Sequence, residues 1–176
     1  SKSALTTITD TATVTITNDD SATLTISDNT TAENSGPSVV TLSVDNAVQG
    51  GFWVTVQRAD GTATVADSDY TAGTDNVSFT GTAGESQTVN ITLGGDSKLE
   101  NDETFSVSMS NSSKSALTTI TDTATVTITN DDSATLTISD NTTAENSGPS
   151  VVTLSVDNAV QGGFWVTVQP VSYTHL

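Results

Sequence analysis

Clusters of acidic side chains are the part of this sequence best suited to chemistry. They fall in short segments between apolar runs, as Glu33 in TAENSG, Asp67 and Asp69 in ADSDY, Asp96, Glu100, Asp102 and Glu103 in GGDSKLENDETF, and Asp131 and Asp132 in TITNDD. Hard cations such as calcium take six to eight oxygen ligands, usually carboxylates from separate loops together with backbone carbonyls. So many carboxylates held together without a cation would repel one another. The clusters therefore indicate a cation site.

Two other readings of these acids are open. Asp is also an ordinary turn residue, because its side chain bonds nearby backbone amides. We assign that role to Asp28, Asp45, Asp60, Asp75 and Asp122, and the cation role to Asp69, Asp96, Glu100, Glu103 and Asp131.

A pair such as Glu100 and Glu103 is also the kind that hydrolyses glycosides, but that chemistry needs a cleft. Short loops leave little material for one, and the chain offers no cysteine and only His175, so we expect no enzyme.

Composition supports a cation as the partner. The 176 residues include 21 Asp and Glu against 4 Lys and Arg, a formal net charge of −17. Such an excess repels nucleic acid and anionic membrane, so we expect neither as a partner. Without cysteine there is no disulfide, and a bound metal is another way to stabilise a small extracellular domain. The sequence shows neither a signal peptide nor an apolar run long enough to span a membrane.

The chain is built from a long internal repeat. Residues 1–57 recur without change as residues 113–169, a period of 112 residues. A unit of this length is a whole domain, which predicts domains in series rather than a solenoid. We divide the chain into the end of one repeat (1–20), a complete repeat (21–132), the start of a third (133–169) and a tail (170–176). The tail ends in VSYTHL, which resembles an adapter-derived cloning scar, and we exclude it together with His175.

Apolar residues alternate with Thr and Ser in seven short runs of the complete repeat, the period of half-buried strands. The runs are Ala22-Leu24-Ile26, Val40-Leu42-Val44, Phe52-Val54-Val56, Val77-Phe79, Val89-Ile91-Leu93, Phe105-Val107-Met109 and Ala124-Val126-Ile128. Turn residues separate them, and no helical period is sustained. The pattern predicts an all-β, seven-stranded antiparallel immunoglobulin-like sandwich. Its core should include Leu24, Leu42, Val54, Ile91, Val107 and Val126, with Trp53 on the outer face.

Four motifs follow one another along the complete repeat: AENSG, DGTATVADSDYTAG, D-x-x-x-E-x-D-E-T-F and TATVTITNDD. In this order and spacing they resemble the Calx-β domain of sodium–calcium exchangers and large bacterial surface proteins. The resemblance implies calcium held by loops at one end of the sandwich. Carried over by position, its ligands are Glu33, Asp69, Asp96, Glu100, Glu103, Asp131 and Asp132, with Asp19 and Asp20 serving the preceding repeat and Glu145 the following one. Gly94-Gly95-Asp96 stands where exchanger members have a run of acids, and Lys98 lies nearby, so we expect one or two ions.

From these features we expect a calcium-binding structural or adhesive repeat. It would rigidify an extended protein outside the cell or on its surface, with calcium ions and neighbouring repeats of the same chain as its partners and a cell-surface or matrix ligand bound through other domains. The alternative is a module that binds a glycan or ice directly. Outward threonines such as Thr23 and Thr25, and Thr125, Thr127 and Thr129, resemble the ladders of ice-binding surfaces, although Thr is also the ordinary outward residue of a strand.

Overall fold

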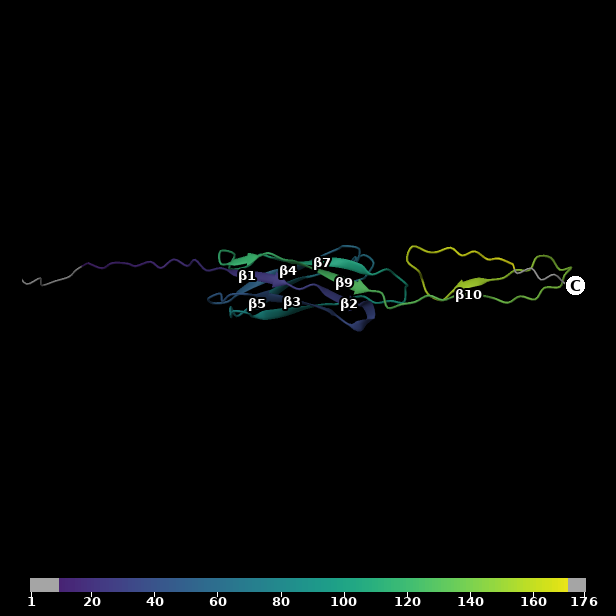
Figure 1. Ribbon diagram of the computed structural model, residues 1–176, viewed down its shortest axis with the longest axis horizontal. Helices are drawn as coiled ribbons and strands as arrows, with labels where there is room; N and C mark the ends of the chain where they lie inside the picture. Colours follow the sequence, from purple (N-terminus) through teal and green to yellow (C-terminus); the bar gives the residue numbers. More distant parts are fainter. Residues whose placement is uncertain (1–9, 171–176) are drawn as a thin grey trace, which may run out of the picture.

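The computed structural model describes residues 10–170, in which a β-sandwich is followed by a small two-stranded sheet (Figure 1). Residues 1–9 and 171–176 lie outside this range, so His175 and most of the predicted tail do too. The sandwich contains nine strands: β1 (Ala22–Ile26), β2 (Asn29–Ala32), β3 (Ser38–Val44), β4 (Phe52–Ala59), β5 (Thr74–Phe79), β6 (Ser86–Ile91), β7 (Glu103–Ser110), β8 (Thr118–Ile120) and β9 (Thr123–Thr129).

The strands form two layers, a four-stranded sheet in the order β6-β3-β1-β8 and a five-stranded sheet in the order β2-β9-β7-β4-β5. The all-β sandwich is therefore as predicted, and each of the seven predicted runs contributes a strand. The strand count differs, because β2 and β8 are additional. Both arise where the chain passes from one sheet to the other. It leaves the four-stranded sheet after β1 and enters the five-stranded sheet at β2, across Ser27 and Asp28, and it does so again between β8 and β9 across two residues. The pairs β1–β8 and β2–β9 are parallel, so the sheets are not wholly antiparallel.

The core lies between the two sheets and is formed by the inward side of the alternating strands. All six residues predicted to be buried are at most 1% exposed. Two aromatic stacks belong to the core, Tyr70 on Phe105 with ring centroids 4.0 Å apart and Phe52 on Phe79 at 4.9 Å. Trp53 is 43% exposed, on the outer face as expected. Burial of apolar area at about 25 cal/mol per Å² supplies the main favourable term for such a fold.

The acids assigned to turns are tied into the fold by hydrogen bonds. Asp60 accepts from the Tyr70 hydroxyl (2.6 Å) and the Val65 amide (3.1 Å). Burial, together with the bond to Asp60, raises the pKa of Tyr70 to about 12. Asp28, Asp45 and Asp122 accept backbone amides of neighbouring strands. Asp75 is a correction, because it lies within β5 rather than in a turn and pairs there with Arg58.

The start of the third repeat forms a small sheet of β10 (Leu136–Ile138) and β11 (Leu154–Val156). Leu136 pairs with Val156 in the register that joins Leu24 to Val44 in the complete repeat, so the local fold of the repeat is reproduced. The threonine rows considered for ice binding lie on β1 and β9, which belong to different sheets and form no common face. Within residues 10–170, no helix has the length and apolar character that a membrane crossing requires.

Candidate metal centre

One end of the sandwich gathers the acidic loops because several strands end or begin there. The parallel pairing of β2 with β9 ends at Ala32 and Thr129, which brings Glu33 beside residues 130–132. Glu103 opens β7 opposite Ile128 of β9. The loop after β4 carries Asp69, and an isolated bridge between Tyr70 and Leu93 joins that loop to the segment after β6. Segments distant in sequence thus converge at this end of the molecule.

A first group of carboxylates consists of Glu33, Asp96 and Asp132, each offering an oxygen within 4.8 Å of the others. Glu33 is only 7% exposed. Its Oε1 and the Oδ2 of Asp132 are buried without a hydrogen-bond partner among the described residues. Burial raises the pKa of both carboxyl groups, and the charges of nearby acids add to the rise, while a hydrogen bond from the Asp131 backbone partly offsets it for Glu33. A buried oxygen with no donor is costly unless a cation or proton satisfies it.

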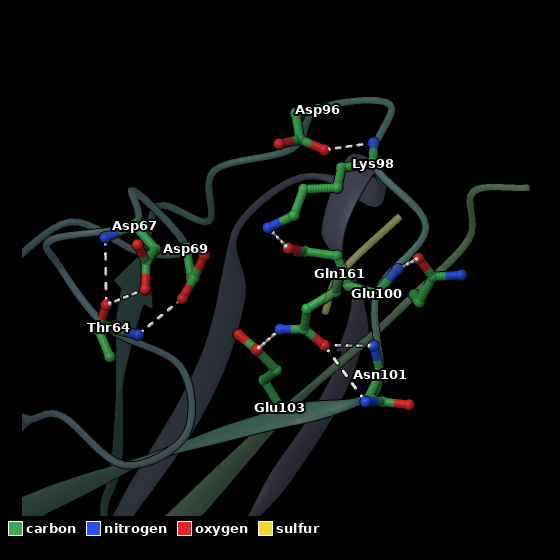
Figure 2. A network of polar contacts seen from close by, with 10 residues as sticks. Thr64, Asp67, Asp69, Asp96, Lys98, Glu100, Asn101, Glu103 and Gln161 are labelled. Atoms are coloured by element: carbon green, nitrogen blue, oxygen red, sulfur yellow. Dashed lines mark hydrogen bonds and ion pairs between the residues drawn. The ribbon is translucent and has the colours of Figure 1, made fainter. Parts of the chain in front are cut away.

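The second group consists of Asp69, Glu100 and Glu103, and each again offers a carboxylate oxygen within 4.8 Å of the others. Burial raises the pKa of Glu103; a hydrogen bond from Gln161 partly offsets this, while the charges of Asp69 and Glu100 add to it. A cavity of about 10 Å³ lies among the three carboxylates and also touches Glu33. That volume is about what one water or ion occupies. Figure 2 shows the Asp69 side chain on one loop and the Glu100 and Glu103 side chains on the segment that leads into β7.

Gly94 and Gly95 form the wall between the two groups. A Cβ atom at Gly94 would collide with the carbonyl of Ser68, and one at Gly95 with the Asn34 side-chain oxygen. Gly94 also donates its amide to the Asp69 carbonyl at 2.9 Å. Gly94, part of the departure from the acid-rich pattern noted in the sequence, is therefore required by a close approach of backbones, whereas a side chain at Gly95 would displace the Asn34 side chain. No acidic side chain would fit at these positions without moving the wall.

Neutral amide side chains connect the acidic loops, and reasoning from carboxylates alone missed them. Asn130 Oδ1 accepts the Glu100 backbone amide at 2.9 Å, and the Asn130 backbone amide donates to Asp102 Oδ1 at 3.1 Å. Asn34 donates to Asp131 Oδ1 at 2.8 Å. The signal was present in the sequence, since Asn34, Asn101 and Asn130 each stand beside a predicted acid in AENSG, LEND and TITNDD.

The carboxylates implied by the family resemblance do not all lie together. The two groups contain Glu33, Asp69, Asp96, Glu100, Glu103 and Asp132. Asp131 is in neither and is exposed, bonded to Asn34. Asp67 bonds the Thr64 hydroxyl at 3.0 Å, and Asp102 holds Asn130. Asp19, Asp20 and Glu145 are exposed in the flanking copies and belong to no group among the described residues.

Lys98 supplies the positive charge nearest to these acids. Its Nζ pairs with Glu100 Oε1, and its backbone amide donates to Asp96 Oδ1 at 2.6 Å. The hydrogen bond to Glu100 raises the pKa of Lys98, so the ammonium is held in its charged form. Lys98 thus neutralises part of the second group, as its position in the sequence suggested.

The donor set consists of oxygens alone, with no histidine or cysteine within reach among residues 10–170. Carboxylate oxygens from several loops suit a hard divalent cation rather than zinc or copper. The orphaned oxygens of Glu33 and Asp132 fit such an ion directly. Fold and site together define a β-sandwich domain with a candidate metal-binding centre of carboxylates at one end.

Comparison with known proteins gives the family. The sequence model of the Calx-beta domain matches residues 17–132, and the chain belongs to this family. Among solved structures, the apo-form Calx CBD1 domain is 24% identical with a TM-score of 0.57, covering 64% of this chain and 100% of that one. The calcium binding domain CBD12 of CALX1.1 is 25% identical with a TM-score of 0.54, covering 62% of this chain and 44% of that one. A search of the curated proteins gave no match.

Proposed function

We propose that this chain is a calcium-binding repeat module that stiffens an extended protein outside the cell or on its surface. The observation that carries the proposal is the pair of buried carboxylate oxygens, Glu33 Oε1 and Asp132 Oδ2, which have no hydrogen-bond partner among the described residues and belong to one group of three acids. A similar solved structure is described as a calcium binding domain, which favours calcium among the hard cations. Magnesium suits the site less well, because it demands tight octahedral geometry and sheds water reluctantly.

Stiffening follows from where the centre lies. Glu33 and Asp132 belong to the same group, and Asp132 is followed within a few residues by the next copy, which begins its strand pattern at Ala134. An ion bound to Asp132 therefore ties the start of the linker to the body of the repeat. Without the ion, repulsion among the carboxylates loosens the same junction. A secreted location agrees with the use of a metal in place of disulfides and with millimolar calcium outside cells.

Calorimetric titration of the full chain tests the calcium assignment. We expect heat of binding with calcium, a much weaker response with magnesium, and a clear loss of affinity in Glu33→Gln. Asp122→Asn is the matched control, because Asp122 accepts backbone amides and belongs to neither group. Absence of heat and of any melting shift up to about 10 mM calcium, well above the usual range for extracellular modules, would reject the assignment.

Small-angle X-ray scattering tests the stiffening. Two complete copies of residues 21–132 in series should give a narrower, longer distance distribution with calcium than with chelator. The variant Asp132→Asn in the first copy should bring the calcium profile toward the chelated one. Identical profiles in calcium and chelator, in a protein that binds calcium, would leave binding in place and refute the rigidifying role.

A further inference from the structure

A turn of the third repeat contacts the acidic end of the complete repeat. The Leu99 amide donates to the Ala159 carbonyl at 2.9 Å, and the Gln161 amide donates to the Leu99 carbonyl at 2.9 Å. Leu99 and Val160 form a parallel bridge through these bonds. The segment that carries Glu100 and Glu103 is thus paired, backbone to backbone, with residues 159–161 of the following copy.

The Gln161 side chain extends this contact into the metal centre (Figure 2). Its Oε1 accepts both the backbone amide and the Nδ2 of Asn101, each at 3.2 Å. Its Nε2 donates to Glu103 Oε1 at 2.8 Å. Both ends of the Gln161 amide are therefore used, one on the loop backbone and one on a carboxylate of the second group.

The turn that makes these contacts has the conformation of the same turn in the complete repeat. Asp157 accepts the Thr135 amide at 2.6 Å, as Asp45 accepts the Thr23 amide at 2.6 Å. The bond from Gly163 to the Val160 carbonyl (3.1 Å) likewise repeats the one from Gly51 to Val48 (3.1 Å). The turn is therefore a preformed feature of the repeat.

In the complete repeat this turn borders a pocket of about 430 Å³, whose lining includes Val48 and Gln49 of the turn and Asn18 and Asp20 of the preceding copy. Gln49, the counterpart of Gln161, is exposed there. Each repeat thus carries an acidic loop at one end and, at the other, the turn that pairs with such a loop. A second copy of this repeat is the partner that fits both.

We propose that residues 157–163 dock on residues 99–103 of the repeat before them, and that Gln161 raises the calcium affinity of that repeat. The regulatory half rests on the proposed function. Docking holds the loop that bears Glu100 and Glu103 in one arrangement, so less conformational freedom remains to be lost when the ion binds. By linkage, calcium strengthens docking by the same factor.

Docking is tested first, in chelator, by disulfide trapping in the full chain, which has no cysteine of its own. Bridge partners in adjacent strands lie within the Cα spacing of about 4.4–6.8 Å that a disulfide needs. Leu99→Cys with Val160→Cys should close within one chain at micromolar protein. Leu99→Cys with Val48→Cys, the same position in the other copy of the turn, should not. Failure of the first pair, or equal closure of both, would overturn docking.

Coupling is tested by calcium titration of Gln161→Ala against Gln49→Ala. We expect about fivefold weaker binding in the first, the lower end of typical coupling between sites, and no change in the second. Equal affinities in both variants and the parent chain would overturn the role of Gln161. If the disulfide forms but the parent chain binds no calcium, docking stands, while the regulatory role and the proposed function both fail.

Discussion

Replacing Glu103 by Gln separates the two roles of this carboxylate, its contact with neighbours and its charge. Gln keeps the length and one carbonyl oxygen, so the bond from Gln161 to that oxygen remains possible. What is lost is a charged ligand of the second group. In chelator the variant should melt at a higher temperature than the parent, because burial and the charges of Asp69 and Glu100 make the ionised form of Glu103 unfavourable.

The effect in calcium has the opposite sign. An extracellular module with a Kd of about 0.1 mM gains about 2.7 kcal/mol at 10 mM calcium, which is 100 times Kd. Loss of one charged ligand that weakens binding about tenfold leaves roughly 1.4 kcal/mol. At about 4 °C per kcal/mol for a repeat of this size, the calcium-induced rise in Tm falls from about 11 °C to about 6 °C.

Differential scanning calorimetry in chelator and in 10 mM calcium measures both effects. Glu85→Gln is the matched control. Hydrogen bonds from the Thr80 backbone and its neighbours lower the pKa of Glu85 to about 2, and Glu85 belongs to neither carboxylate group among the described residues. Its replacement should lower the Tm in both conditions and leave the calcium-induced rise unchanged. A Glu103→Gln variant that melts lower than the parent in chelator and keeps the full calcium rise would refute the reasoning.

Three further results are expected. In chelator the Tm should increase as the pH falls from 7 toward 4.5, because Glu33 and Glu103 have raised pKa values in the folded state and their protonation therefore favours folding. The Tm should then decrease from pH 4.5 toward 2, because Glu85 has a lowered pKa in the folded state and its protonation favours unfolding. A Tm that decreases steadily from pH 7 would contradict this. Lys98→Met should tighten calcium binding a few-fold in calorimetric titration, because the Lys98 ammonium neutralises Glu100 and repels a bound cation; weaker binding would contradict this. Leu42→Ala, at a fully buried position, should lower the free energy of unfolding by about 2–5 kcal/mol in denaturant melts, and a loss below about 1 kcal/mol would mean that the core is not packed as described.

Strands and core were predictable because alternation reports burial directly. Leu24, Val54 and Val126 each stand in a run whose period admits one inward face. The strand β2 was not predictable in this way, since NTTA offers no apolar alternation and forms only because β9 supplies a parallel edge. Asp75 was misassigned because a single Asp has turn propensity, whereas its environment in β5 includes Arg58, a residue 17 positions away.

The candidate centre was partly predictable. The order of the motifs identified the acidic residues of the site. Their division into two groups depends on how closely the loops approach one another, as at Gly94 and Gly95, and the sequence does not show this. Asn130 and Gln161 were missed because neutral amides are ordinary in turns and carry no charge pattern. Gln161 was further hidden by its distance in sequence, since its partners Asn101 and Glu103 lie about 60 positions earlier, in another repeat.

Parallel pairing of β1 with β8, and of β2 with β9, has a consequence for how identical neighbouring repeats fold. Residues 134–138 repeat the sequence of β1 without change, so they are chemically able to take its place beside β8. That place lies at the far end of the sandwich from Thr129. The return would span about ten residues of strand, roughly 33 Å, whereas the four residues between β9 and Ala134 reach at most about 14 Å. The topology itself thus prevents the first strand of one copy from replacing the identical first strand of the copy before it, which closes one route to misassembly in a chain of identical repeats.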